Sequence, residues 1–139
     1  NTFYQEVRYT APDAQTIMEI AGVQYQTAVR LAEAISAALA GLGGALLFGD
    51  RFTETDIRLF VTLIRFDAAY HGLFKTNLRR IADYPRLQAH MERVLRLPGV
   101  VETVNLDHIK AGYYSIKALN PSGIVPAGPD HVARLLASV

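Results

Sequence analysis

The stretch Phe52-Thr53-Glu54-Thr55-Asp56-Ile57 has the pattern of a helix start. Thr53 is the predicted N-cap and Asp56 the third helical residue. The Thr53 hydroxyl can then accept the Asp56 backbone N–H while the Asp56 carboxylate accepts the Thr53 N–H. This reciprocal pair is a capping box, and Phe52 and Ile57 are spaced to form a hydrophobic staple around it. We therefore predict a helix that begins at about residue 54.

The helix that follows is predicted over residues 54–70. Its residues are apolar in most directions, which is typical of a helix in the middle of a bundle. Only Arg58, Thr62 and Arg65 form a polar stripe along it. Because an unpaired buried charge is costly, the arginines need partners. They either form structural ion pairs with Asp or Glu, or face a cleft or another domain.

Helical periodicity recurs outward from this segment, whereas a sustained alternation of period two is absent. Further helices are predicted over 13–21, over 25–39, from Pro85 onward, and from a cap at Asn105 or Asp107 through Tyr113-Tyr114. Residues 120–129 hold three prolines and two glycines and are predicted to be irregular. The fold class is therefore all-α, as one domain over 1–139 with about six or seven helices.

Composition narrows the function classes. The chain has 139 residues, of which 50% are hydrophobic and 19% charged, and its net charge is +1. This composition excludes intrinsic disorder, and the balanced charge argues against a nucleic-acid binder. The absence of cysteine excludes a disulfide scaffold, a zinc finger and a thiol nucleophile within this chain. We expect the chain to be a piece of a longer protein, since it starts at Asn1.

One long apolar stretch, residues 31–48, carries the single charge Glu33. A membrane span needs roughly 20 apolar residues. Glu33 and the glycines at 41, 43 and 44 interrupt this stretch, which therefore predicts a buried helix and a loop, with no membrane partner. The first twenty residues lack the apolar core of a secretory signal.

The polar side chains give few catalytic signals. The four histidines are far apart in sequence, so no metal site is predicted. Asp107 precedes His108, but without a nucleophile motif a capping or surface role for His108 is favoured over catalysis. The seven tyrosines include Tyr4 near the start and the adjacent pair Tyr113-Tyr114. A phenol can bind an oxygenated aromatic ligand, or it can simply pack as an amphipathic side chain.

Several motifs together resemble one protein family. They are Gly49 to Ile57, Leu63-Ile64-Arg65-Phe66-Asp67, Phe74 to Leu78, Asp83-Tyr84-Pro85, Pro98-Gly99-Val100, Asp107-His108-Ile109-Lys110, Tyr113-Tyr114 and Asn120 to Pro129. The first motif resembles the C-terminal domain of glutathione transferases in general. The others resemble the Xi class, whose members are glutathionyl-hydroquinone reductases. The resemblance is dense over 49–129 and thin before it, with departures at Leu73, Thr76 and Gly112.

The resemblance implies a fold, partners and site residues. The fold would be the glutathione transferase C-terminal bundle, and the family's N-terminal thioredoxin-like domain with its catalytic cysteine is absent from this chain. The chain would then hold no catalytic residue, use glutathione only as a co-substrate of the whole enzyme, and need no metal. By motif position, Tyr113 and Tyr4 would bind the hydroquinone, whereas Thr53 and Asp56 are structural. A cytoplasmic homodimer is implied.

The implied function is that of a substrate-side and dimerisation domain. In the family reaction, the enzyme cysteine attacks the sulfur of a glutathionyl-hydroquinone, and a second glutathione resolves the mixed disulfide. Two alternatives stay open from the residues: a non-catalytic helical interaction module, and an unrelated ligand-binding bundle.

Overall fold

The computed structural model describes residues 46–139, so the helices predicted over 13–21 and 25–39 lie outside the described residues. The elements, in order, are α3 (Glu54–Arg65), the π-helical turn η1 (Phe66–Tyr70), α4 (His71–Leu73), the 3₁₀ turn η2 (Ile81–Asp83), α5 (Pro85–Leu95), the 3₁₀ turn η3 (Val101–Thr103), α6 (Leu106–Tyr114) and α7 (Asp130–Ser138). Within 46–139 the only bridges are two isolated ones at the turn over 46–51. The all-α prediction is confirmed.

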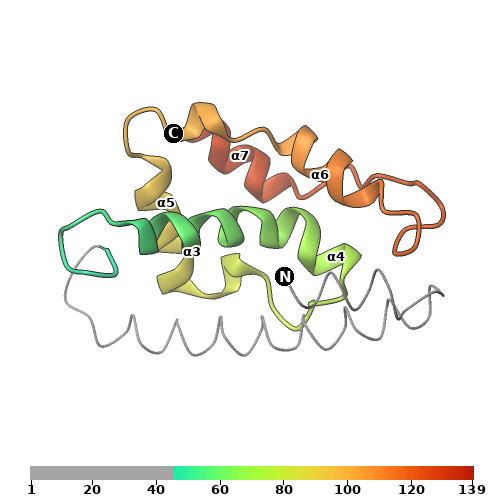
Figure 1. Ribbon diagram of the computed structural model, residues 1–139, viewed down its shortest axis with the longest axis horizontal. Helices are drawn as coiled ribbons and strands as arrows, with labels where there is room; N and C mark the ends of the chain where they lie inside the picture. Colours follow the sequence, from blue (N-terminus) through green and yellow to red (C-terminus); the bar gives the residue numbers. More distant parts are fainter. Residues whose placement is uncertain (1–45) are drawn as a thin grey trace.

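The core lies where α3 packs against α5. Figure 1 shows α3 across the middle of the molecule, with α6 and α7 above it in that view. The fully buried residues Leu87 and Leu95 of α5 and Ile81 of η2 belong to the same hydrophobic cluster as Phe60 of α3. Pro85 stands at the start of α5, where its missing N–H costs no hydrogen bond, as predicted.

The predicted capping box lies at the start of α3. The Thr53 N–H donates to Asp56 Oδ2 (2.9 Å), and the Thr53 hydroxyl lies 3.3 Å from the same oxygen. The other carboxylate oxygen accepts the Leu47 N–H (3.0 Å) and His90 Nε2 (2.9 Å). Burial raises the pKa of Asp56, but the hydrogen bonds from His90, Leu47 and Thr53 outweigh it and leave the pKa below its usual value. One carboxylate thus ties the 46–51 turn, α3 and α5 together.

The outer face of α3 differs from the prediction. Phe52 and Ile57 are 44% and 46% exposed, so the predicted staple does not bury them. Val61 is also exposed, whereas Phe60, Leu63 and Ile64 are buried. The helix was predicted to lie in the middle of a bundle, but one of its apolar sides stays exposed, because apolar residues also remain on the surfaces of folded proteins.

The helix does not end cleanly at Arg65 but passes into the π-helical turn η1 and then α4. The sequence did not predict this turn. Its Asp67 carboxylate accepts the backbone N–H groups of Ile81 (2.7 Å) and Ala82 (3.3 Å) and contacts His131 Nε2 of α7 (2.9 Å). Because π-turns inside α-helices frequently occur at functional sites, the surroundings of η1 are a candidate site.

The C-terminal part is held by Lys110 of α6. Its buried ammonium donates to three carbonyl oxygens, those of Pro126 (3.1 Å), Ala127 (3.1 Å) and Gly128 (3.3 Å). These bonds hold segment 120–129 against α6. The segment is irregular, as the sequence predicted. The segment leads into α7, which the sequence analysis did not predict.

Candidate functional site

Tyr113 on α6 faces η1. Asn105 is the N-cap of α6, and its side chain accepts the His108 N–H (3.0 Å), which fixes the start of the helix and leaves Asp107 in the first turn. Two turns later, the Tyr113 hydroxyl lies 3.0 Å from the Tyr70 hydroxyl of η1. Since Tyr113 and Tyr70 are 43 residues apart, this contact depends on the packing of α6 against η1.

The rings of the two tyrosines pack against each other and against a third ring, that of Phe74. The ring centroids of Tyr70 and Tyr113 are 5.3 Å apart with an interplanar angle of 79°, an edge-to-face arrangement. Phe74 meets Tyr113 at 5.8 Å and 85°, and Tyr70 at 5.5 Å. We call Tyr70, Phe74 and Tyr113 the aromatic cluster. It holds the phenol of Tyr113 in one orientation while leaving this side chain only half-buried.

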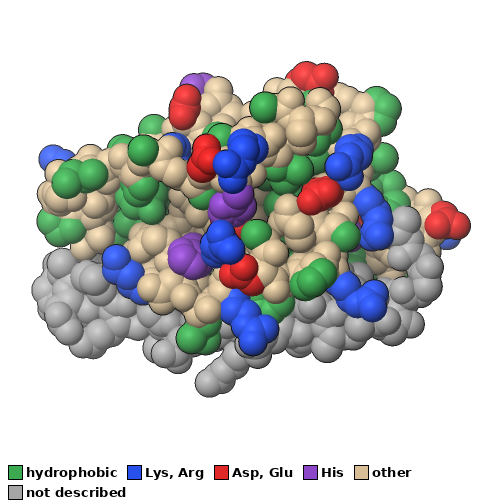
Figure 2. All heavy atoms as spheres, turned by 180° about the vertical axis from the view of Figure 1, so that it is seen from behind, with side chains coloured by type: hydrophobic (Ala, Val, Ile, Leu, Met, Phe, Trp, Pro, Cys, Tyr) green, Lys and Arg blue, Asp and Glu red, His purple; other side chains and the backbone are tan. Residues whose placement is uncertain are grey.

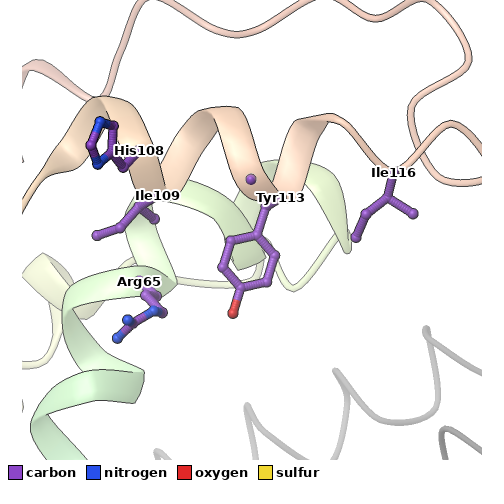
Figure 3. Close-up of a pocket in the computed structure, with 6 residues that line it drawn as sticks. Arg65, His108, Ile109, Tyr113 and Ile116 are labelled. Atoms are coloured by element: carbon purple, nitrogen blue, oxygen red, sulfur yellow. The ribbon is translucent and has the colours of Figure 1, made fainter.

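A groove runs beside Tyr113 between α3 and α6. Its wider part has a volume of about 460 Å³ and is lined by Arg65, His108, Ile109, Gly112, Tyr113 and Ile116. A narrower part of about 240 Å³ shares Arg65, His108 and Ile109 and extends along α3 to residues 103–105. In Figure 3, Ile109 and Tyr113 of α6 and Ile116, just after the end of α6, point to the side on which Arg65 lies, and His108 lies near the start of α6. We call the two parts together the α3–α6 groove.

The two arginines of the polar stripe on α3 have different roles: one forms an ion pair, and the other faces a cleft. Arg58 is exposed and pairs with Glu54 (2.6 Å), one turn earlier. Arg65 is half-buried and lines the groove, and its Nη1 donates to the Val61 carbonyl oxygen (2.8 Å). Arg65 forms no ion pair with any described residue. The first arginine is therefore structural, and the second faces a cleft.

The two adjacent tyrosines have different surroundings. Tyr114 is only 8% exposed, and burial raises the pKa of its phenol. Its hydroxyl sits against Gly72, where an added Cβ would lie 2.6 Å from the oxygen, so a larger residue at this position would displace the Tyr114 side chain. Tyr113 instead opens onto the groove. The geometry thus assigns Tyr114 to packing and makes Tyr113 the tyrosine available to a ligand.

The other predicted site residues do not gather here. Tyr4 lies outside the described residues. Thr53 and Asp56 stand at the opposite end of α3 from Arg65, about 18 Å and about 14 Å away along the helix axis at the usual rise per residue. Residues 46–139 contain no group of three potential metal-ligating side chains. None of the helices in this part of the chain is long and apolar enough to cross a membrane.

Sequence reasoning missed Tyr70. It lies in the π-turn, so the helical spacing that placed the other residues of this segment gave no signal for its direction. Figure 2 shows the molecule from behind the view of Figure 1, and on this face Lys and Arg side chains are interspersed with Asp and Glu, without a wide area of one charge.

The chain resembles characterised proteins over part of their length. It is 58% identical over 88 residues to the glutathionyl-hydroquinone reductase PcpF of Sphingobium chlorophenolicum, a match that covers 63% of this chain and 28% of that protein. The match to the glutathionyl-hydroquinone reductase YqjG of Escherichia coli (46% identical over 84 residues) covers 26% of that protein. The chain therefore spans about a quarter of the length of these curated relatives.

Solved structures agree. The glutathione-bound structure of YqjG superimposes with a TM-score of 0.65 at 34% identity, covering 93% of this chain and 40% of that one. The Xi-class glutathione transferase from Phanerochaete chrysosporium gives a TM-score of 0.71 at 33% identity, covering 94% and 47%. The resemblance stated from the sequence motifs is confirmed. The profile of the glutathione S-transferase C-terminal domain matches residues 9–93, and the chain belongs to this family.

Proposed function

We propose that this chain is the substrate-side domain of a glutathione-dependent reductase that acts on glutathionyl-hydroquinones. One observation carries the proposal: the Tyr113 hydroxyl opens onto the α3–α6 groove and is held by Tyr70 at 3.0 Å. The similarity to PcpF and YqjG, both named glutathionyl-hydroquinone reductases, supports the same substrate class. The catalytic thiol would come from a thioredoxin-like domain outside these 139 residues, because they include no cysteine.

The proposed reaction needs two steps. A cysteine thiolate attacks the sulfur of the glutathionyl-hydroquinone, so that a sulfur–sulfur bond forms and the carbon–sulfur bond to the ring breaks. The ring carbon takes a proton, and the product leaves as the free hydroquinone. A second glutathione then attacks the enzyme–glutathione mixed disulfide, which releases oxidised glutathione and the cysteine. The two electrons come from the thiols, and no metal takes part.

Tyr113 supports the first step by contact with the ring oxygen. As the carbon–sulfur bond breaks, negative charge develops on the hydroquinone, and a phenol O–H donated to it stabilises that charge. If the Tyr70 hydroxyl donates to the oxygen of Tyr113, the Tyr113 proton is left to point at the substrate. We expect the enzyme to be a homodimer and to work in the cytoplasm, where glutathione is kept reduced.

The alternative is a non-catalytic interaction module with the same bundle. Such a module would need the core of α3 and α5 but not a half-buried tyrosine pair beside a groove. The α3–α6 groove therefore favours the reductase. Turnover of a glutathionyl-hydroquinone by the longer protein that carries this chain distinguishes the two functions.

We predict that Tyr113→Phe in that longer protein lowers kcat/KM about tenfold or more, the effect of losing one hydrogen bond to a group that develops charge. Folding should be nearly intact, since only a hydroxyl is removed. Tyr114→Phe is the matched control, because Tyr114 is buried against Gly72 and should affect turnover little. Steady-state kinetics of the two variants decide this, and normal turnover by Tyr113→Phe would remove Tyr113 from the site.

The purified 139-residue chain alone should show no glutathione-dependent turnover, because it has no thiol to form the mixed disulfide. To test this, glutathione and a glutathionyl-hydroquinone are mixed with the chain, and chromatography measures the free hydroquinone that is released. Turnover above the rate without protein would mean that a group other than cysteine performs the first step.

A further inference from the structure

The α3–α6 groove contains a positive charge that the proposed reaction does not use. Arg65 lines both parts of the groove. Its Nη1 donates to the Val61 carbonyl oxygen of its own helix, and no other hydrogen bond or ion pair connects it to residues 46–139. A guanidinium has five N–H donors, so residues 46–139 leave most of the Arg65 donors for a ligand.

No negative charge among the described residues that line the groove balances Arg65. Among these described lining residues there is no Asp or Glu, and Asp107 of α6 is not one of them. Arg58, on the same helix, shows the contrast, because a carboxylate of its own helix already neutralises it. A half-buried guanidinium without a carboxylate attracts an anion more strongly than an exposed pair does, since water screens it less.

The remaining walls select the kind of anion. Ile109 of α6, Ile116 just after the end of α6 and Ile64 of α3 give the groove apolar surface, and Tyr113 adds an aromatic ring with a hydroxyl. Figure 3 shows Arg65 and Tyr113 on the same side of α6, separated along the groove. This arrangement suits a flat ring that carries a hydroxyl at one position and an anionic substituent at another.

We propose that Arg65 is a specificity-determining residue that selects hydroquinones bearing a carboxylate on the ring. The inference rests on the proposed function and names its substrate class. Tyr113 holds a ring hydroxyl, while Arg65 pairs with the carboxylate, a geometry in which a guanidinium can donate two parallel hydrogen bonds. Arg65 changes no bond of the substrate, so it is a binding residue and not an acid or base.

Binding to the purified chain tests the proposal without catalysis. Hydroquinone and 2,5-dihydroxybenzoate, which differ by one carboxylate, are titrated into the chain by calorimetry. We expect the carboxylated compound to bind at least about tenfold more tightly, the effect of one charge-assisted hydrogen-bond pair. Arg65→Gln keeps a donor for the Val61 carbonyl but removes the charge, and it should abolish this preference. Arg65→Lys should restore part of it.

Arg58→Gln is the matched control, since it removes an arginine from the same helix outside the groove, and it should keep the full preference. Equal affinity of the wild-type chain for the two compounds, binding of neither, or a preference that survives in Arg65→Gln would overturn the proposal. Turnover of the two corresponding glutathionyl conjugates by the longer protein is measured separately. Loss of turnover on both conjugates refutes the reductase function and leaves the binding result standing, whereas equal turnover on both refutes only the role of Arg65.

Discussion

Replacing Asp56 by alanine is expected to lower the free energy of unfolding by about 3–5 kcal/mol. The carboxylate is fully buried and accepts hydrogen bonds from Leu47, Thr53 and His90. Its removal takes the acceptor from four donors: the backbone N–H groups of Leu47 and Thr53, the Thr53 hydroxyl, and the ring nitrogen of His90, a residue only 1% exposed. Chemical denaturation followed by circular dichroism measures the change.

Two substitutions calibrate this effect. Thr53→Ala removes only the hydroxyl of the cap and should cost about 1 kcal/mol. Glu54→Ala removes an exposed carboxylate two residues away, whose partner Arg58 is also in solvent, and should change stability by at most about 0.5 kcal/mol. If Asp56→Ala destabilises the chain no more than Thr53→Ala does, the carboxylate is not the connection between α3 and α5.

The pH dependence has a defined sign. Because the pKa of Asp56 in the folded chain is lowered from 3.8, its contribution is fully present above that value and is lost as the pH falls through the lower folded pKa. The wild-type chain should therefore lose stability below about pH 4 more steeply than Asp56→Asn, which cannot titrate. Parallel stability curves for the two proteins would contradict the hydrogen-bonded, ionised carboxylate.

Local signals in the sequence were sufficient for the helices they mark. The Thr53–Asp56 spacing and Pro85 each mark a helix start, and the structure has a helix at both places. The C-terminal helix α7 could also have been predicted, because Val132, Leu135 and Leu136 recur at the spacing of one helical face. At Asn105 and Asp107 the sequence offered two caps, and the structure selects Asn105.

The site was harder to predict, since it depends on contacts between distant residues. His90 lies 34 positions from Asp56, and Tyr70 lies 43 positions from Tyr113. Neither pair has a sequence spacing from which the contact could be predicted. The direction of Tyr70 also depends on a π-turn, for which the regular helical period gives the wrong face. The motif resemblance selected Tyr113, whereas the roles of Tyr70 and Arg65 required the packed structure.

The second large effect is expected at Asp67, the carboxylate of the π-turn. Asp67→Ala should lower the free energy of unfolding by about 3–5 kcal/mol, because the side chain is 3% exposed and three donors lose their acceptor. Two of these donors, the backbone N–H groups of Ile81 and Ala82, begin the η2 turn. The third, His131, connects α7 to the rest of the bundle.

A double-mutant cycle separates these contributions. His131→Ala removes only the contact to α7 and should cost less than Asp67→Ala, and the two effects should not add, since both break the same 2.9 Å contact. Asp130→Ala is the control, because this neighbouring aspartate is 77% exposed and pairs with an exposed Arg134. The denaturation midpoints of Asp67→Ala, His131→Ala, the double variant and Asp130→Ala are the measurement.

Asp67 also bears on the groove, because it belongs to the π-turn that follows Arg65 and ends at Tyr70, and its bonds attach this turn to η2 and α7. If the turn relaxes in Asp67→Ala, the Tyr70 hydroxyl should move from Tyr113, and the chain should bind 2,5-dihydroxybenzoate more weakly even at temperatures where it remains folded. His131→Ala leaves the bonds to η2 in place and should bind this compound nearly as the wild type does. Loss of stability in Asp67→Ala with unchanged binding would show that the groove between α3 and α6 does not depend on the π-turn.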